Sequence, residues 1–138
     1  MIKTISLSIF CSLLAIVGCS DSSSESANQS PTIIVRYQGD PLANVRVQLH
    51  DSESGPVVAA AISDQAGQAR FKQLSPPGGP QHFVSAESIS DGGWILDPKL
   101  GKPATSGLSI PSFDSTSQQH HELDLPPSAV RLLTRKKR

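Results

Sequence analysis

Cysteine and long apolar runs are scarce in this chain, and both shortages narrow what it can be. Only two cysteines occur, Cys11 and Cys19. Both precede residues 31–127, which read as a folded domain, so that domain has no disulfide and depends on its packed core alone. The longest apolar run, Ile5–Val17, has 13 residues, whereas a membrane-spanning helix needs about 20.

Signatures of catalysis and of metal binding are also missing. The sequence has no Gly-x-Ser-x-Gly motif, and no helix is expected after Gly92-Gly93, as a phosphate-binding loop would require. His120 and His121 are adjacent, so on a strand they point to opposite faces and do not easily reach one ion. We therefore expect no enzyme activity, no metal site and no cofactor. A small hydrolase is the alternative, and it requires a cluster of titratable groups in one cleft.

The N-terminus has the features of an export signal. Lys3 precedes the short apolar run, which is the pattern of a secretory signal peptide. The run ends in Ile16-Val17-Gly18-Cys19, which resembles the bacterial lipobox. This resemblance implies a signal peptide over residues 1–18 and attachment of diacylglyceryl and acyl groups to Cys19. The alternative is a soluble secreted protein with a cysteine near its cleavage site.

The lipobox resemblance also implies a location. Ser20, rather than aspartate, follows the cysteine, and in the resembling lipoproteins this accompanies export to the outer membrane. Residues 19–30 are polar and without periodicity, and they predict a solvated tether between lipid and domain. We expect a lipid-anchored protein of the cell envelope, with the membrane as its first partner.

The domain itself reads as an all-β structure. In Asn44–His50 apolar and polar residues alternate, which is the pattern of a strand with one buried face. Similar segments between turn residues predict seven strands, at 32–38, 44–50, 57–63, 68–72, 82–88, 108–110 and 119–125. Trp94–Leu96 is either a further brief strand or a plug over one end. We predict a seven-strand, Greek-key, immunoglobulin-like β-sandwich.

Two turns are specified by residue type. Gly39-Asp40-Pro41 combines the φ freedom of glycine with the fixed φ of proline. Asp64-Gln65-Ala66-Gly67 starts with an aspartate suited to a type I turn and ends with a glycine suited to a left-handed residue. Four residues are therefore expected to have structural roles in turns: Gly39, Pro41, Asp64 and Gly67.

The order of these motifs resembles a known family. The segments Gly39-x-Pro41-Leu42, Val45-x-Val47-x-Leu49, Ser63-Asp64-x-x-Gly67-x-x-x-Phe71 and Pro76-Pro77-Gly78 look like the carboxypeptidase regulatory-like, transthyretin-type β-sandwich. The segments Asp97-Pro98-Lys99, Thr105–Leu108 and Glu122–Leu125 are similar to those of small planctomycete lipoproteins that carry this domain. The resemblance covers residues 31–127.

Charge is divided between an acidic body and a basic end. Residues 19–130 contain 6 basic and 12 acidic side chains, a net charge of −6. In the tail, residues 128–138, Ser128 is a candidate cap for a short helix. Because each cation near an anionic lipid surface contributes about 1 kcal/mol, the tail cations are candidate contacts to such a surface: Arg131, Arg135, Lys136, Lys137 and Arg138. The alternative is a solvated end with no partner.

Two functions compete on this basis. The first is a non-catalytic envelope lipoprotein whose sandwich is a structural or binding module for an envelope polymer or protein. The second is a carbohydrate- or peptidoglycan-binding domain, with Trp94 as the candidate ligand contact through stacking. Nucleic acid is not an expected partner, because the exported body is acidic.

Overall fold

All seven expected strands are present, and three short strands join them. The structure, a computed structural model, describes residues 30–72, 74, 79–89, 93–113 and 120–133. The expected strands are β1 (Thr32–Tyr37), β3 (Val45–His50), β4 (Val57–Ile62), β5 (Gln68–Arg70), β6 (Gln81–Ser88), β8 (Leu108–Pro111) and β9 (His120–Leu125). The additional ones are β2 (Asp40–Pro41), β7 (Trp94–Leu96) and β10 (Val130–Leu132). The predicted number was too low, because segments this short are recognised as strands only by their pairing.

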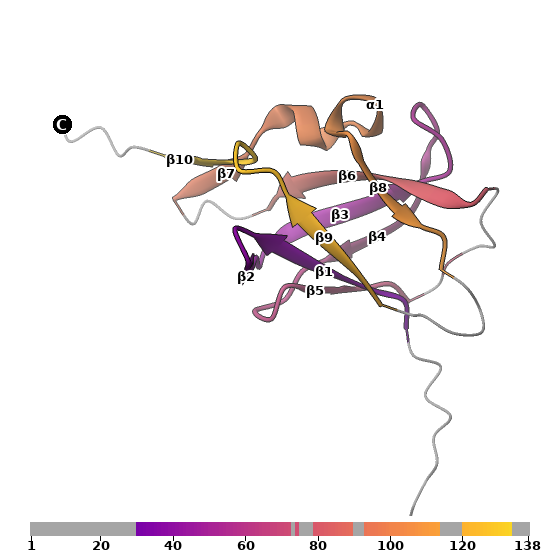
Figure 1. Ribbon diagram of the computed structural model, residues 1–138, viewed down its shortest axis with the longest axis horizontal. Coiled ribbons are helices and arrows are strands. Elements are labelled where there is room, and N and C mark those ends of the chain that lie inside the picture. Colours follow the sequence, from indigo (N-terminus) through magenta and orange to yellow (C-terminus); the bar gives the residue numbers. More distant parts are fainter. Residues whose placement is uncertain (1–29, 73, 75–78, 90–92, 114–119, 134–138) are drawn as a thin grey trace, which may run out of the picture.

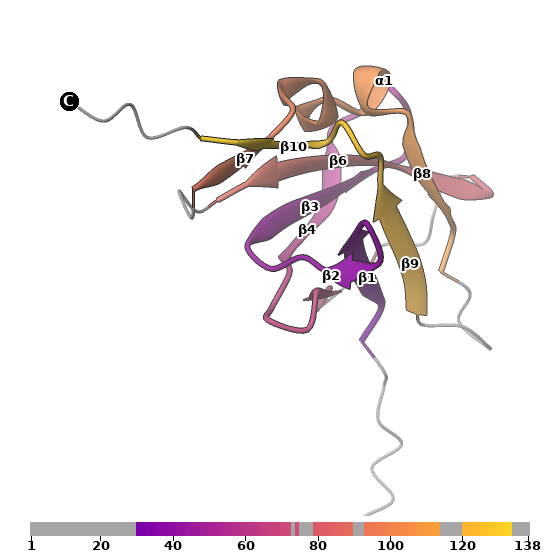
Figure 2. The ribbon, with the colours of Figure 1, turned by 60° about the vertical axis from the view of Figure 1, so that its left-hand side comes forward.

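Two sheets face each other, and a small third sheet extends beside them. In the first, β1 pairs with β9 in parallel on one side, and with β5 and β2 antiparallel on the other. The second has the order β4-β3-β6-β8 and is antiparallel throughout. β7 and β10 form the third sheet (Figure 1, Figure 2). The predicted all-β sandwich is confirmed, and its Greek-key order stays a prediction.

Alternation along the strands decides which side chains form the core. On β3, Val45, Val47 and Leu49 are fully buried between the sheets. On β9, the inward-facing side chains of His121–Leu125 lie in register with those of Ile33–Tyr37 on β1. Each large apolar side chain that is fully buried contributes roughly 1.5–3 kcal/mol relative to an exposed one. This burial holds the two sheets together.

One end of the sandwich, called the turn end below, is closed by hydrogen-bonded turns. Between β1 and β2, Gln38 and Gly39 have φ of 53° and 87°. Positive φ at both central residues is what a type I′ turn requires, and this turn matches the twist of the strands it joins. The turn was expected at Gly39-Asp40-Pro41, but Asp40 and Pro41 form β2 instead, with Pro41 opposite Arg36. Their pairing with β1 moves the turn one residue towards the N-terminus.

The second turn packs against the first. The Asp64 carboxylate accepts hydrogen bonds from the amides of Ala66 and Gln68, each at 2.9 Å. Gly67 has a φ of 75°, and a Cβ built on it would lie 2.6 Å from the carbonyl oxygen of Val35 and 3.0 Å from Cβ of Pro41. Glycine is therefore needed here both for its φ and for the close approach of two backbones.

A short helical segment covers part of the second sheet. The 3₁₀-helix η1 (Pro98–Gly101) and the helix α1 (Pro103–Ser106) both pack on β6 (Figure 1). Within the described ranges, no helix has the length and apolar character needed to cross a membrane.

The chain stays in the fold beyond residue 127, where the domain was expected to end. β10 pairs antiparallel with β7, and the amide of Leu133 donates to the carbonyl of Gly93 at 2.7 Å. The helix expected after Ser128 was therefore wrong, because pairing with a distant segment overrides the local signal. The folded unit extends to Leu133.

Candidate functional site

Trp94 lies on the two-stranded extension. It is the first residue of β7, stands opposite Leu132 of β10, and its half-buried side chain packs against the core. Leu132 is 80% exposed. Part of the indole therefore stabilises the extension, and part of it faces solvent beside an exposed apolar side chain.

Arg131, one of the predicted surface contacts, is engaged within the fold. Its Nη2 lies 2.8 Å from Oδ2 of Asp97, whose Oδ1 accepts from the Lys99 amide at 3.0 Å. The Lys99 amide first, and then the Arg131 guanidinium, hold the pKa of the Asp97 carboxyl below its usual value. Arg131 thus joins β10 to the start of η1. The other predicted contacts lie outside the described residues, as does the lipidation residue: Arg135, Lys136, Lys137, Arg138 and Cys19.

A serine and a histidine meet on the face of the second sheet that points away from the core. His50 Nε2 lies 3.0 Å from Oγ of Ser85, and its Nδ1 lies 2.9 Å from the carbonyl oxygen of Gly55. Because a carbonyl only accepts, Nδ1 carries the proton and donates it. The distances are those of a nucleophile and base, but Ser85 is 0% exposed. No substrate reaches that hydroxyl, and the pair is structural.

The end opposite the turn end, called the aromatic end, is filled by four rings. The ring centroid of Phe113 lies 4.7 Å from that of His121 and 6.4 Å from those of Phe71 and His82. Phe71 follows β5, His82 belongs to β6, Phe113 follows β8, and His121 belongs to β9. Four segments far apart in the sequence thus close this end by side-chain packing.

Two imidazole nitrogens in this cluster are buried and have no hydrogen-bond partner among the described residues, His82 Nδ1 and His121 Nε2. His82 Nδ1 lies 3.5 Å from Oδ1 of Asp51, close enough for attraction but outside hydrogen-bond geometry. Burial lowers the pKa of His121, and the neighbouring His82 lowers it further. Both effects favour the neutral ring, because a charge here would lose its hydration beside another imidazole.

The adjacent histidines do not point the same way. His120 is exposed while His121 faces the interior, since neighbouring strand residues project to opposite faces. In the part of the chain that the structure describes, no group of three or more His, Cys, Asp or Glu side chains is placed to hold a metal ion.

A groove of about 490 Å³ runs along the outer edge of β4. Its walls are residues 59–62 of β4, Arg46 of β3, and Arg70–Lys72 at the end of β5. β4 and β5 are joined by one bridge, Ser63 to Ala69, and then enter different sheets. The groove is the space that this divergence leaves between the sheets.

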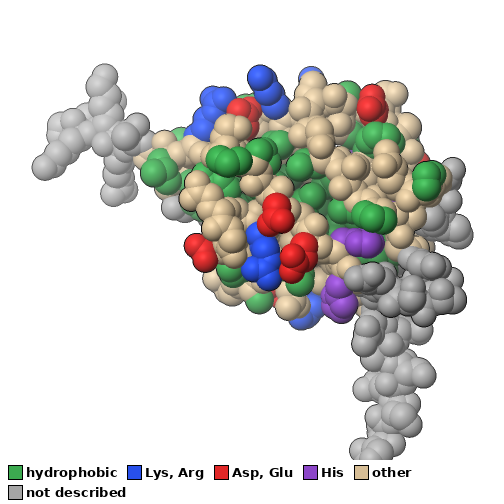
Figure 3. Space-filling view, in the orientation of Figure 1, with side chains coloured by type: hydrophobic (Ala, Val, Ile, Leu, Met, Phe, Trp, Pro, Cys, Tyr) green, Lys and Arg blue, Asp and Glu red, His purple; other side chains and the backbone are tan. Residues whose placement is uncertain are grey.

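The charge of this groove is of one sign. Arg46, Arg70 and Lys72 line it, and its described lining contains no carboxylate. The face of β1 and β9 differs, because acidic and basic side chains lie side by side there (Figure 3), and Arg36 pairs with Glu122 at 3.4 Å. The groove is therefore the candidate binding surface.

A smaller cavity of about 290 Å³ lies between β6, β7 and η1. Two carboxylates line it, those of Glu87 and Asp97. Asp97 already pairs with Arg131 at 2.8 Å, and Glu87 lies 3.9 Å from Arg46. This cavity is a weaker candidate than the groove, where Arg70 and Lys72 have no carboxylate partner among the described residues.

Comparison with protein-family models, with curated proteins and with solved structures gave no match. The transthyretin-type resemblance therefore stays a prediction.

Sequence analysis identified neither the groove nor the ring cluster. The three groove cations come from β3, from β5 and from the second position after β5, with no common motif. Composition was the one available signal, because residues 19–130 contain only 6 basic side chains. The structure places three of these 6 along one groove.

Proposed function

We propose that this protein is a non-catalytic lipoprotein of the cell envelope, anchored by lipid on Cys19, whose β-sandwich acts as a binding or structural module. The position of Cys19 carries the proposal. It stands in a lipobox-like context directly after an apolar run of signal-peptide length, and β1 begins at Thr32. Residues 19–30 are then the tether, because the carbonyl of Pro31 already accepts from the Phe71 amide at 2.8 Å, and Ser20 favours the outer membrane.

The described side chains support binding rather than catalysis. Ser85 lies within reach of an imidazole but is fully enclosed, and His82 is 1% exposed. The accessible feature is instead a groove with three cations. Such a surface suits recognition of an anionic partner more than general acid–base chemistry, which needs a titratable group in contact with substrate.

The order of motifs supports a transthyretin-type, Greek-key sandwich. Two glycines that carry the resemblance both have positive φ, Gly39 in the turn between β1 and β2 and Gly67 in the turn between β4 and β5. A sandwich held by such turns suits a module that presents its edges and loops to an envelope polymer or protein.

The experiment that tests the anchor is metabolic labelling with an alkyne fatty acid. The parent chain is expected to carry the label and to fractionate with membranes, whereas Cys19→Ser loses both properties. Cys11→Ser is the matched control, because Cys11 lies within the discarded run, and it should leave both unchanged. Label retained in Cys19→Ser would refute the proposal.

A second candidate is glycan binding at Trp94. The observation in its favour is the partial exposure of Trp94 beside the exposed Leu132. Pull-down on insoluble peptidoglycan is expected to weaken in Trp94→Ala and to persist in Trp94→Phe, which keeps a stacking ring. Equal retention of Trp94→Ala and the parent would end this reading.

The basic tail is proposed as a further attachment of the lipid-anchored protein to the membrane, in addition to the lipid on Cys19. Arg131 is paired with Asp97, so we expect the attraction to an anionic surface to come from the four cations of residues 134–138. Deleting residues 134–138 from the Cys19→Ser chain should weaken sedimentation with anionic liposomes, whereas Arg131→Ala should change it little. Unaltered sedimentation after the deletion would make the tail a solvated end.

A further inference from the structure

β4 is an edge strand whose outer side is unpaired along Val57–Ile62 in the described part of the chain. Edge strands present N–H and C=O groups with which another strand can pair. The β4 sequence VVAAAI contains no proline and no charge, and Val57 and Ile62 are 45% and 49% exposed. The register between β3 and β4 shifts between Leu49 and His50, so the regular part of this edge is Ala59–Ile62, and nothing within these four residues blocks pairing.

The opposite edge of the same sheet is different. β8 is four residues long, ends in Pro111, and lies close to β9. A short strand ending in proline is a poor template for pairing, because proline lacks the N–H that a ladder needs. The open edge of the second sheet is therefore β4.

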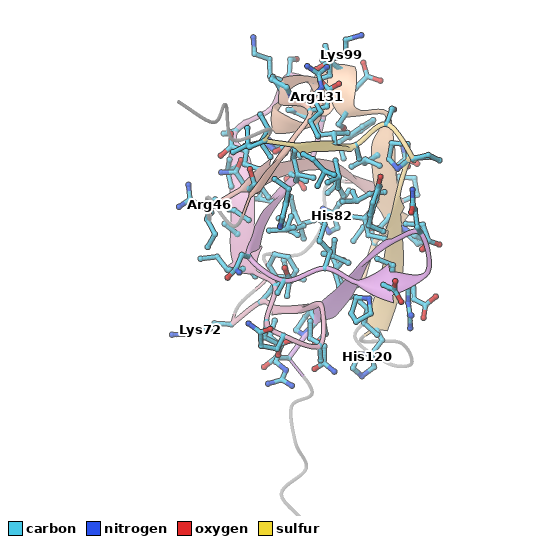
Figure 4. All side chains as sticks on the ribbon, turned by 90° about the vertical axis from the view of Figure 1, so that its left-hand side faces the viewer. Arg46, Lys72, His82, Lys99, His120 and Arg131 are labelled. Atoms are coloured by element: carbon cyan, nitrogen blue, oxygen red, sulfur yellow. The ribbon has the colours of Figure 1, made fainter. Side chains whose placement is uncertain are left out.

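Three cations line the groove beside this edge, one from the paired strand β3 and two from β5 and the residues that follow it. Arg46 stands opposite Ile62 across β3 and β4, while Arg70 and Lys72 lie on the far wall of the groove. Their contacts leave a surplus of positive charge. Arg46 has a distant partner in Glu87 at 3.9 Å, and Arg70 donates at 2.6 Å to the neutral side chain of Gln68. Figure 4 shows Arg46 and Lys72 projecting on the same side of the molecule, with Lys99 at another end.

We infer that β4 binds an extended acidic peptide, which adds as a strand to the second sheet and sets its carboxylates against Arg46, Arg70 and Lys72. Main-chain hydrogen bonds to β4 hold the peptide, and its side chains, which alternate in direction, select the sequence. Apolar residues of the same peptide pack on Ala60 and Ile62, which line the groove and are exposed.

A second copy of this chain is the competing occupant. Pairing two β4 strands would bring the three cations of each copy to one interface, and like charges on neighbouring strands are destabilising. An acidic segment instead neutralises them. Charge complementarity therefore favours a partner of opposite sign.

The inference rests on the proposed function in one respect, that the sandwich is a binding module. It requires neither the lipid nor Trp94. The test uses the full chain with Cys19→Ser and a fluorescein-labelled, end-capped nonapeptide that alternates valine and glutamate. One matched peptide carries lysine in place of glutamate. A second is N-methylated at alternate residues, which keeps its side chains but removes ladder donors.

The expected result is a saturable rise in fluorescence anisotropy with the acidic peptide and little rise with either matched peptide. Amides of residues 59–62 should become protected from hydrogen exchange when the acidic peptide is bound. Added salt should weaken binding, because the attraction between exposed charges is screened.

Charge reversal on the groove wall is the protein-side test. Arg70→Glu combined with Lys72→Glu is expected to weaken binding about tenfold or more. Lys99→Glu combined with Lys102→Glu makes the same charge change away from the groove and should bind like the parent. If the groove variant melts at a lower temperature, Arg70→Gln with Lys72→Gln replaces it.

Three outcomes would overturn the inference. Equal binding of the N-methylated peptide would mean ionic attraction without strand addition. Absence of binding by the acidic peptide would mean that the cations only oppose pairing of this edge with other chains, and so protect the protein from aggregation. A concentration-dependent dimer that buries β4 would assign the edge to a second copy. None of these outcomes alters the lipid label on Cys19, so the two proposals fail separately.

Discussion

At the turn end of the sandwich, backbone hydrogen bonds close the gap between strands, whereas at the aromatic end side chains fill it. The turn end uses residues a few positions apart, such as Asp64 and Gly67: the amide of Gly67 donates to the carbonyl of Asp64 at 2.9 Å. The aromatic end uses Phe71, Phe113 and two histidines from four different segments. Among the described residues, the first end leaves one buried side-chain nitrogen without a partner, Arg36 Nε. The second leaves two buried imidazole nitrogens without partners among the described residues.

The two ends are therefore expected to differ in what disturbs them. The turn end is sensitive to changes in backbone conformation, and the aromatic end is sensitive to pH. Turns with positive-φ glycines have little freedom to adjust, because both the backbone dihedral and the close approach are specified. The aromatic end depends on pH through His121, because protonation of this half-buried imidazole places a charge where its hydration is reduced. The two ends should therefore respond to different perturbations.

The largest effect is expected at the aromatic end, from loss of Phe71. This side chain is 1% exposed and contacts Phe113. Phe71→Ala removes a buried ring and leaves a cavity, so it should cost about 3–5 kcal/mol of unfolding free energy in urea denaturation. Phe83→Ala, at a half-buried ring on the outer face of β6, is the control and should cost roughly half as much or less. Similar losses in both variants would mean that the ring cluster does not close this end.

At the turn end, Gly67→Ala is expected to cost about 2–3 kcal/mol, through its positive φ and the contact of the new Cβ with the Val35 carbonyl. Gly39→Ala is the matched control. It also has positive φ, but nothing lies within 4 Å of its Cβ position. That variant should cost only about 1 kcal/mol by thermal or urea denaturation. Equal losses of unfolding free energy in the two variants would mean that the close approach of Gly67 to the Val35 carbonyl does not contribute.

A pH effect of intermediate size is expected from His121. Its pKa is lowered in the folded state from an ordinary value of 6.5. Below that pH the unfolded chain takes up the proton more readily, so stability should fall as the pH drops from 6.5 towards the lowered pKa. Above pH 6.5 both states are neutral and the effect vanishes.

Melting temperatures at pH 7.5 and pH 5.0 measure this contribution. The parent should melt lower at pH 5.0, and His121→Leu should reduce the difference. His120→Leu removes an exposed imidazole next to it and should preserve the difference. An undiminished pH dependence in His121→Leu would assign the titration to another group.

The smallest effect is expected at Asp97, on the two-stranded extension. Removing the guanidinium in Arg131→Ala should raise the pKa of the Asp97 carboxyl, measured by NMR titration. That pKa should stay below 3.8, because the Lys99 amide is the larger cause of its lowering. The stability linked to Asp97 is present above pH 3.8 and is lost as the pH falls through the lowered pKa. Arg36→Ala, which breaks the separate pair with Glu122, is the control and should leave Asp97 unchanged.

Most of the fold was readable from local pattern, and most of the candidate site was not. Alternation in Val45–His50 identified a strand and its buried face, and the aspartate and glycines identified both turns. Short strands were missed where pairing is distant, as for Val130–Leu132. The groove was missed because Arg46 and Lys72 come together only when β4 and β5 diverge into separate sheets.

The sequence by itself determined an all-β domain with two defined turns, because strand alternation and turn dihedrals depend on residues within a few positions of each other. Tertiary structure alone decided the rest. It enclosed Ser85, brought His82 and His121 against the ring of Phe113, and paired Arg131 with Asp97. Within the described residues it also left the outer side of β4 unpaired, beside a groove lined by three cations. These features depend on which strands become neighbours, and that choice is made by the burial of the whole core rather than by any one segment.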